Sequence, residues 1–78
     1  MEIGNSNIHN LFIAISGNKA IIVASSLVDF VEKMKKLEPN VKNRQYYSKH
    51  FENNEFYYFQ NSVSGQLYIF QKIENTKE

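Results

Sequence analysis

Side chains able to hold a metal ion or to transfer protons are few and widely spaced in this sequence. Cysteine is absent, and the two histidines, His9 and His50, are 41 positions apart with no cluster of acids beside them. Metal sites in proteins are built from several such ligands at helical or turn spacings. The sequence therefore predicts no metal site, and we interpret His50 as a half-exposed residue among tyrosines.

Glu52 and Glu55 form a pair of carboxylates whose spacing could serve general acid and base catalysis. They flank Asn53 and Asn54, however, and acids beside an Asn-Asn pair are typical of a solvated turn. The serines lack the context of a catalytic nucleophile, and Ser26 is explained as a helix cap. The three glycines are isolated, so the sequence predicts no phosphate-binding loop. We therefore expect no catalytic residues and no cofactor, and we expect that the protein is not an enzyme.

A basic segment offers the chemistry of phosphate binding. Positions 33–50 hold six basic residues and one acid, although the net charge of the whole chain is only +1. The lysines in the first half of this segment are explained by the end of a helix, whose dipole favours cations. The remaining cations, together with two tyrosines, could contact a phosphate backbone while the rings stack on bases. Single-stranded nucleic-acid binding is therefore the alternative function, and its candidate residues are Lys42, Arg44, Tyr46, Tyr47 and Lys49.

The density of aromatic side chains is the second unusual feature, because nine of the eleven lie between positions 46 and 70. In the segment 56–59, Phe56 and Tyr58 point to one side of a strand and Tyr57 and Phe59 to the other, so both sides carry aromatic rings. A strand with a solvated side alternates apolar and polar residues instead. The second face of the sheet therefore needs a cover, which is an N-terminal arm, a second copy of the chain or a target protein. We predict that the partner-binding residues on this face are Tyr57, Phe59, Tyr68 and Phe70.

The elements that position these side chains begin with a hairpin. The apolar segments 11–15 and 20–24 flank Gly17 and Asn18, a pair suited to a two-residue loop. The pairs expected from this loop are Ile15 with Ala20, Ile13 with Ile22 and Leu11 with Ala24.

An amphipathic helix follows the hairpin. Ser26 is a suitable N-cap, and Asp29 stands three residues later, where the acid of a capping box belongs. Pro39 ends the helix at Leu37 or Glu38, because the residue before proline avoids the helical conformation. We expect the helix to cover one face of the sheet with an apolar stripe formed by Leu27, Phe30, Val31, Met34 and Leu37.

The segment between the helix and the last hairpin has two interpretations. Residues 46–51 form a strand that turns at Asn53 and Asn54, or they form a second helix. Residues 56–60 and 66–73 then form a hairpin around a serine-rich loop. The predicted fold is α+β, with one helix packed on an antiparallel sheet of four or five strands. The order is β-β-α-β-β-β, or β-β-α-α-β-β if the middle element is helical.

The length of the chain allows one domain, because two cores of this total size would each be too small to offset chain entropy. We predict an N-terminal arm at residues 1–10, a single domain at 11–73 and a polar tail at 74–78. The longest apolar runs have five residues, far fewer than a membrane-spanning helix needs, so no contact with a membrane is expected. The absence of cysteine and of a basic leader favours a cytoplasmic location.

The hypothesis that explains most of these features is a noncatalytic protein-protein interaction module. A small tyrosine-rich domain without a cofactor motif suits a regulator or inhibitor that occupies the surface of another macromolecule. Self-association through the sheet, as a homodimer, would cover its second apolar face. The bias toward asparagine, lysine, isoleucine and tyrosine is compatible with an AT-rich bacterial or phage genome.

Overall fold

The computed structural model describes residues 10–74, so most of the predicted arm and tail lies outside the described residues. Within this range the α+β class is confirmed, in the order β-β-α-α-β-β. The four strands form one antiparallel sheet with the spatial order β3-β2-β5-β4. The elements are β2 (Asn10–Ser16), β3 (Lys19–Ala24), α1 (Leu27–Leu37), α2 (Arg44–His50), β4 (Phe56–Gln60) and β5 (Leu67–Glu74).

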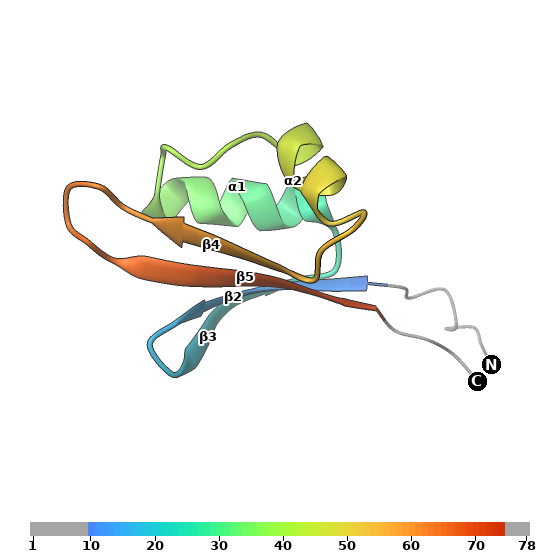
Figure 1. The fold of residues 1–78 in the computed structure, drawn as a ribbon, viewed down its shortest axis with the longest axis horizontal. Helices are drawn as coiled ribbons and strands as arrows, with labels where there is room; N and C mark the ends of the chain where they lie inside the picture. The colour runs from blue at the N-terminus through green and yellow to red at the C-terminus, as the bar shows by residue number, and fades with distance from the viewer. Residues whose placement is uncertain (1–9, 75–78) are drawn as a thin grey trace.

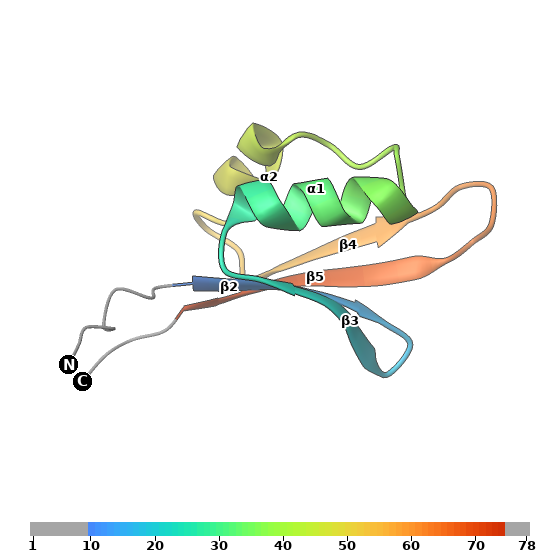
Figure 2. The ribbon, with the colours of Figure 1, turned by 180° about the vertical axis from the view of Figure 1, so that it is seen from behind.

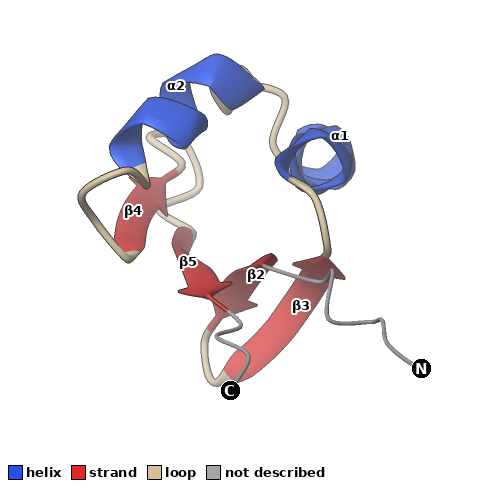
Figure 3. Cartoon of the chain, turned by 90° about the vertical axis from the view of Figure 1, so that its right-hand side faces the viewer, coloured by secondary structure: helices blue, strands red, loops and turns tan. Residues whose placement is uncertain are grey.

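Both helices lie on the same side of the sheet, as Figures 1 and 2 show from opposite directions. Figure 3 shows the same two layers along the sheet, with α2 above β4 and α1 above β3. The described part of the chain is therefore a two-layer domain with its core between the helices and the sheet. No helix in this part of the chain is long and apolar enough to cross a membrane.

The first hairpin turns at Gly17 and Asn18, as predicted. Gly17 has a φ of 65°, a left-handed conformation that glycine adopts readily because it has no Cβ. The strands leave this turn with the predicted pair of Ile15 and Ala20.

A β-bulge beyond this pair changes the register of the hairpin between Ala14 and Ile15. Ile21 is the extra residue on β3, and such a residue reverses the side to which the following side chains point. The predicted pairs beyond the bulge, Ile13 with Ile22 and Leu11 with Ala24, are therefore wrong. The pairs found are Ala14 with Ile22, Ile13 with Val23 and Phe12 with Ala24.

Helix α1 begins at the predicted cap, since the Ser26 hydroxyl oxygen accepts a hydrogen bond from the Asp29 backbone N–H at 3.1 Å. The middle of the predicted apolar stripe is buried against the sheet. Leu37 is a correction to that stripe, because its side chain is 52% exposed. The buried position at this end of the helix is taken by Glu38, the C-cap residue.

Helix α2 resolves the two interpretations of residues 46–51 in favour of the helical one. Its N-cap is Asn43, whose side-chain oxygen accepts a hydrogen bond from the Tyr46 backbone N–H at 3.0 Å. At the other end, the carbonyl of His50 accepts hydrogen bonds from the Asn54 amide at 3.0 Å and from the Asn53 backbone N–H at 3.4 Å. The Asn-Asn pair therefore serves the end of a helix, and Tyr47 faces the core.

Phe70 of β5 lies at the centre of the core, with a fully buried side chain. Its ring meets Phe30 of α1 edge to face, with centroids 5.1 Å apart, and Tyr47 of α2 at 5.6 Å. It also stacks against Tyr57 and Phe59 of β4, at 5.8 and 6.0 Å. One side chain thus joins both helices to the sheet.

Candidate functional site

The four predicted partner-binding residues lie on the helix-covered face of the sheet. Tyr68 and Phe70 are buried, with 8% and 0% of their surface exposed, and Tyr57 and Phe59 pack partly buried against the core. The prediction that they lie on the side away from the helix is therefore wrong. The physical reason is the second helix, because Tyr47 of α2 packs against Tyr57, with ring centroids 5.1 Å apart.

The opposite face of the sheet carries apolar side chains on all four strands. Those in the middle of the central strands β2 and β5 are partly exposed, whereas Leu67 and Ile73 near the ends of β5 are exposed. Those on the edge strands β3 and β4 are all exposed. No other residue of the described range 10–74 forms a layer over this side of the sheet, which lies away from both helices in Figure 1. We call these ten residues the open face: Leu11, Ile13, Ile15, Ile21, Val23, Phe56, Tyr58, Leu67, Ile69 and Ile73.

The pairing of the strands makes the open face continuous. Ile69 on β5 lies between Ile15 on β2 and Tyr58 on β4, so one apolar row crosses three strands. Ile13 on β2 pairs with Val23 on β3, which extends the face to the other edge. Directly opposed side chains on one face of antiparallel strands are in contact. The ten side chains therefore act as one surface.

A bonded pair of polar side chains lies within the area of the open face, because Gln71 on β5 pairs with Ile13 on β2 and with Phe56 on β4. Gln71 is the polar residue within β5 on this side, and its Nε2 donates to Oε2 of Glu55 at 2.7 Å. A four-stranded sheet of this length has a projected face of roughly 400 Å², taking about 4.8 Å between strands and about 3.3 Å per residue. The largest exposed apolar patch on a soluble protein is often a functional surface. The open face is therefore the candidate functional site.

The residues of the nucleic-acid alternative lie around helix α2, and the structure brings only some of them together. Lys42, Arg44 and Lys49 are exposed, and Nζ of Lys42 is 5.6 Å from the centre of the Tyr46 ring. Tyr47 is fully buried, and its hydroxyl oxygen accepts a hydrogen bond from the Lys42 backbone N–H at 3.1 Å. Tyr47 therefore cannot stack on a base in this fold, contrary to the expectation.

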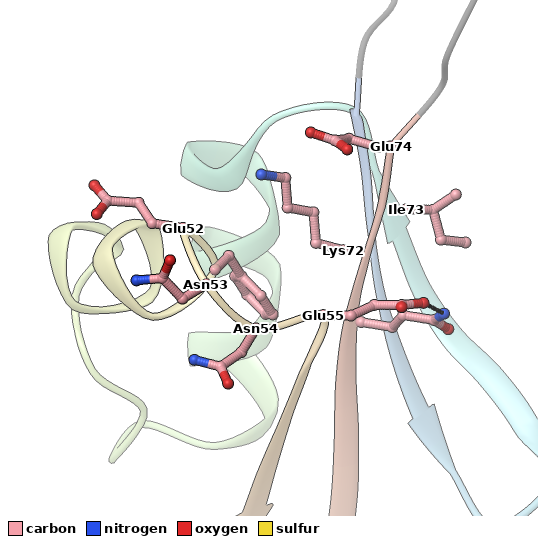
Figure 4. A pocket seen from close by; sticks show the side chains of 9 residues that line it. Glu52, Asn53, Asn54, Glu55, Lys72, Ile73 and Glu74 are labelled. Carbon is pink, nitrogen blue, oxygen red and sulfur yellow. Dashed lines mark hydrogen bonds between the residues drawn. The ribbon is translucent and has the colours of Figure 1, made fainter.

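Glu52 and Glu55 border a hollow between the end of β5 and the turn that follows α2. Figure 4 shows their side chains pointing in different directions, with Glu55 on the side of Ile73 and Glu52 on the side of Lys72. Glu55 is also engaged by Gln71, as the dashed line in the figure marks. The two carboxylates thus do not converge on one point. Over residues 10–74 no three acidic or histidine side chains group as metal ligands would.

Glu38 is the buried polar residue that the pattern of the sequence did not reveal. Only 5% of its surface is exposed, and its Oε2 accepts a hydrogen bond from the Tyr68 hydroxyl at 2.8 Å. Its Oε1 accepts another from the Asn61 amide at 2.6 Å. The carboxylate therefore ties the end of α1 to β5 and to the loop between β4 and β5. The sequence signal for the burial of Glu38 was its position directly after the apolar stripe of the helix and before Pro39.

Burial raises the pKa of three tyrosines, Tyr47, Tyr57 and Tyr68. For Tyr68 the hydrogen bond to Glu38 and the negative charge of that residue raise the pKa further. A raised pKa in the folded state means that folding favours the neutral hydroxyl. The resulting stability is complete below the ordinary tyrosine pKa of 10.0 and is lost as the pH rises above it.

We therefore expect the domain to unfold cooperatively in alkali, starting near pH 10.0. Tyrosinate absorbance and circular dichroism, followed together against pH, should change in the same transition. Tyr57→Phe keeps the ring and removes one ionisable hydroxyl, so it should move the midpoint to higher pH. Ionisation of Tyr47, Tyr57 and Tyr68 well before any loss of secondary structure would contradict this expectation.

No family model, curated protein or solved structure matches this chain. Its site is therefore defined by the geometry of its own residues.

Proposed function

We propose that the protein is a noncatalytic protein-protein interaction module that works through the open face. The observation that carries this proposal is the set of apolar side chains on all four strands, on the side of the sheet that no other described element covers. Burying apolar surface is the main driving force for protein association. A domain that presents such a face acts as a regulator or inhibitor by occupying a protein surface.

The most exposed part of the open face supports a protein partner. Phe56 and Tyr58 on the edge strand β4 are 40% and 64% exposed. Aromatic anchors of this kind contribute much of the binding energy at protein interfaces. The hydroxyl of Tyr58 also allows that residue to lie at a boundary between the contact and water.

Nucleic-acid binding remains the second candidate because of one observation. Nζ of Lys42 lies over the Tyr46 ring, beside the exposed cations Arg44 and Lys49. Cations of this kind contact phosphates, and an exposed ring stacks on a base. Because Tyr47 is buried, only Tyr46 of the two predicted tyrosines is exposed for stacking on a base. The open face therefore supports protein binding more strongly than this surface supports nucleic-acid binding.

Photo-crosslinking in the source cell tests the two surfaces against each other. Tyr58 and Tyr46 are matched positions, since both are tyrosines and they are 64% and 45% exposed on opposite sides of the domain. A photoreactive phenylalanine derivative is placed at one position or the other in the full chain. We expect protein adducts from position 58 and none from position 46.

Adducts from position 46 alone would contradict the proposal. If those adducts contain nucleic acid, and form less at higher salt, the second candidate function is supported instead. Adducts from neither position would also count against an interaction module.

A further inference from the structure

We propose that the partner protein adds an extended segment to the outer edge of β4, so that this segment becomes a further strand of the sheet. This inference rests on the proposed function and specifies how its partner binds. Strand β4 is an end strand, with β5 on one side and no strand of residues 10–74 on the other. The unpaired backbone groups of an end strand are a template for pairing with another chain.

The hydrogen bonds to β5 show which backbone groups of β4 point to its outer edge. Residues of an antiparallel strand alternate between those bonded to a given neighbour and those directed away from it. The carbonyl of Glu55 accepts from the Lys72 N–H at 3.0 Å, and the Asn61 N–H donates to the carbonyl of Gln66 at 2.9 Å. The odd-numbered residues are therefore the ones bonded to β5. The N–H and C=O groups directed to the outer edge are those of Phe56, Tyr58 and Gln60.

Helix α2 occupies one end of this edge and leaves the rest open. Nε2 of His50 lies 2.7 Å from the carbonyl oxygen of Phe56. Because a carbonyl oxygen only accepts, this nitrogen carries the hydrogen of the bond. Within residues 10–74 no other group bonds to the outward N–H and C=O of Tyr58. The donors and acceptors from Tyr58 onward therefore remain for a guest strand.

The opposite edge of the sheet is protected against such pairing. Strand β3 begins with the cation Lys19 and contains the bulge at Ile21. Lysine and bulges are features that prevent strand addition at the edges of natural sheets. Strand β4 has neither, because its five residues are uncharged and its register with β5 is regular. The outer edge of β4 is therefore the one suited to a guest strand.

A guest strand would direct its side chains alternately to the two sides of the sheet. On the open side they lie next to Tyr58, which is 64% exposed. On the helix side they meet a hollow beside α2 whose lining includes Tyr46, Lys49 and His50. This hollow adjoins β4, because the rings of Tyr46 and His50 have centroids 5.8 and 5.0 Å from that of Tyr57. The two sides of the edge thus offer different surroundings to alternate side chains.

The charge beside this edge favours an acidic segment from another protein. Lys42, Arg44 and Lys49 are exposed, and positions 40–51 contain no acid. A second copy paired antiparallel at this edge would bring its own α2 to the same side of the joined sheet, so like charges would repel. Exposed ion pairs add little affinity, so backbone pairing supplies the binding and charge supplies the selection. The occupant is therefore a segment with acidic side chains toward α2 and apolar side chains toward the open face.

Selection from a displayed library of random peptides of about twelve residues, with the full chain as bait, is the test. We expect the enriched peptides to alternate apolar and acidic residues. An enriched peptide is then synthesised and added to the isotope-labelled full chain. It should slow hydrogen exchange of the Tyr58 and Gln60 amides by at least about tenfold, because both N–H groups become bonded.

Tyr58→Pro tests the backbone contact directly. Proline removes the outward N–H and leaves the bonds between β4 and β5 in place, and it is tolerated on an edge strand in that position. Tyr58→Ala is the matched control, since it also removes the ring but keeps the N–H. Tyr58→Pro should bind the enriched peptide at least about tenfold more weakly than Tyr58→Ala, through the lost hydrogen bond and the altered edge. Circular dichroism verifies that both variants are folded.

A pair of lysine variants tests the selection by charge without altering the strand. Lys49→Glu should weaken binding of an acidic peptide by at least about threefold. Lys36→Glu makes the same charge change on α1, which lies above β3 at the other edge of the sheet (Figure 3), and should leave binding unchanged. If Tyr58→Pro does not fold, this pair and the exchange of the Tyr58 amide decide the outcome.

A library without any enriched peptide would overturn the strand addition. An enriched peptide that leaves the exchange of Tyr58 and Gln60 unchanged would overturn it too, as would equal losses within either matched pair of variants. If one of these results is obtained while position 58 still crosslinks to a protein in the cell, strand addition fails and the proposed function stands. If position 58 forms no protein adduct either, both fail.

Discussion

Phe70→Ala is expected to unfold most of the protein at room temperature. The side chain is fully buried, and four aromatic rings surround it with centroids between 5.1 and 6.0 Å away. Truncating a buried phenylalanine costs about 3–5 kcal/mol, because the contacts are lost and the cavity closes only partly. The core of a domain this small supplies roughly 3–5 kcal/mol of net stability without disulfides. The substitution therefore removes most or all of the margin.

Urea unfolding followed by circular dichroism measures this effect. Phe70→Leu provides a milder change whose free energy of unfolding can still be determined, and it should be less stable than the wild type. Phe56→Ala is the matched control on the open face, since that ring is 40% exposed. It should cost clearly less than Phe70→Ala when both are measured at concentrations where dilution no longer changes the midpoint. Equal losses at the two positions would contradict the assignment of the core.

Glu38→Ala is expected to cost about 2–4 kcal/mol of stability, because it removes two hydrogen bonds to a buried charged acceptor. The Tyr68 hydroxyl and the Asn61 amide lose their partner, and the hydroxyl has little access to water. Leaving a buried donor unsatisfied is more costly than never burying it. The loop between β4 and β5 should also become more mobile, which hydrogen exchange at Asn61 and nearby amides would show.

A double-mutant cycle isolates the contribution of the buried pair. Tyr68→Phe removes the donor, so Glu38→Ala combined with Tyr68→Phe leaves no unsatisfied hydroxyl. We expect the double variant to lose less stability than the sum of the two single losses. Glu38→Gln retains an acceptor oxygen and should be less destabilised than Glu38→Ala. Strict additivity in the cycle would show that the hydrogen bond between Glu38 and Tyr68 contributes nothing.

Much of the local structure was predictable because its signals are local. Gly17 and Asn18 specified the first turn, and Ser26 and Pro39 bounded helix α1. The last hairpin was predicted to within one residue at each strand end. Turn residues, caps and the residue before proline act through their own backbone geometry, which does not depend on distant parts of the chain.

The register beyond the first turn was not predictable in the same way. The sequence 20–24 is apolar at every position, so a strand without a bulge and a strand with one bury equally apolar residues. Pairing with β5 and packing against α1 favour the arrangement in which Ile22 and Ala24 join Phe12 and Ala14 in the core. Uniform hydrophobicity thus removes the pattern that normally specifies register.

By itself, the sequence determined the class of the fold, the positions of most elements and the existence of two apolar faces on one sheet. Only the tertiary structure decided which face meets the helices. Alternation along a strand separates Tyr57 and Phe59 from Phe56 and Tyr58, but it does not say which pair is covered when both are apolar. Helix α2 decides this, because Tyr47 packs on the side of Tyr57 and Phe70. The open face, with Tyr58 at its edge, is the side that no element of the described residues 10–74 covers.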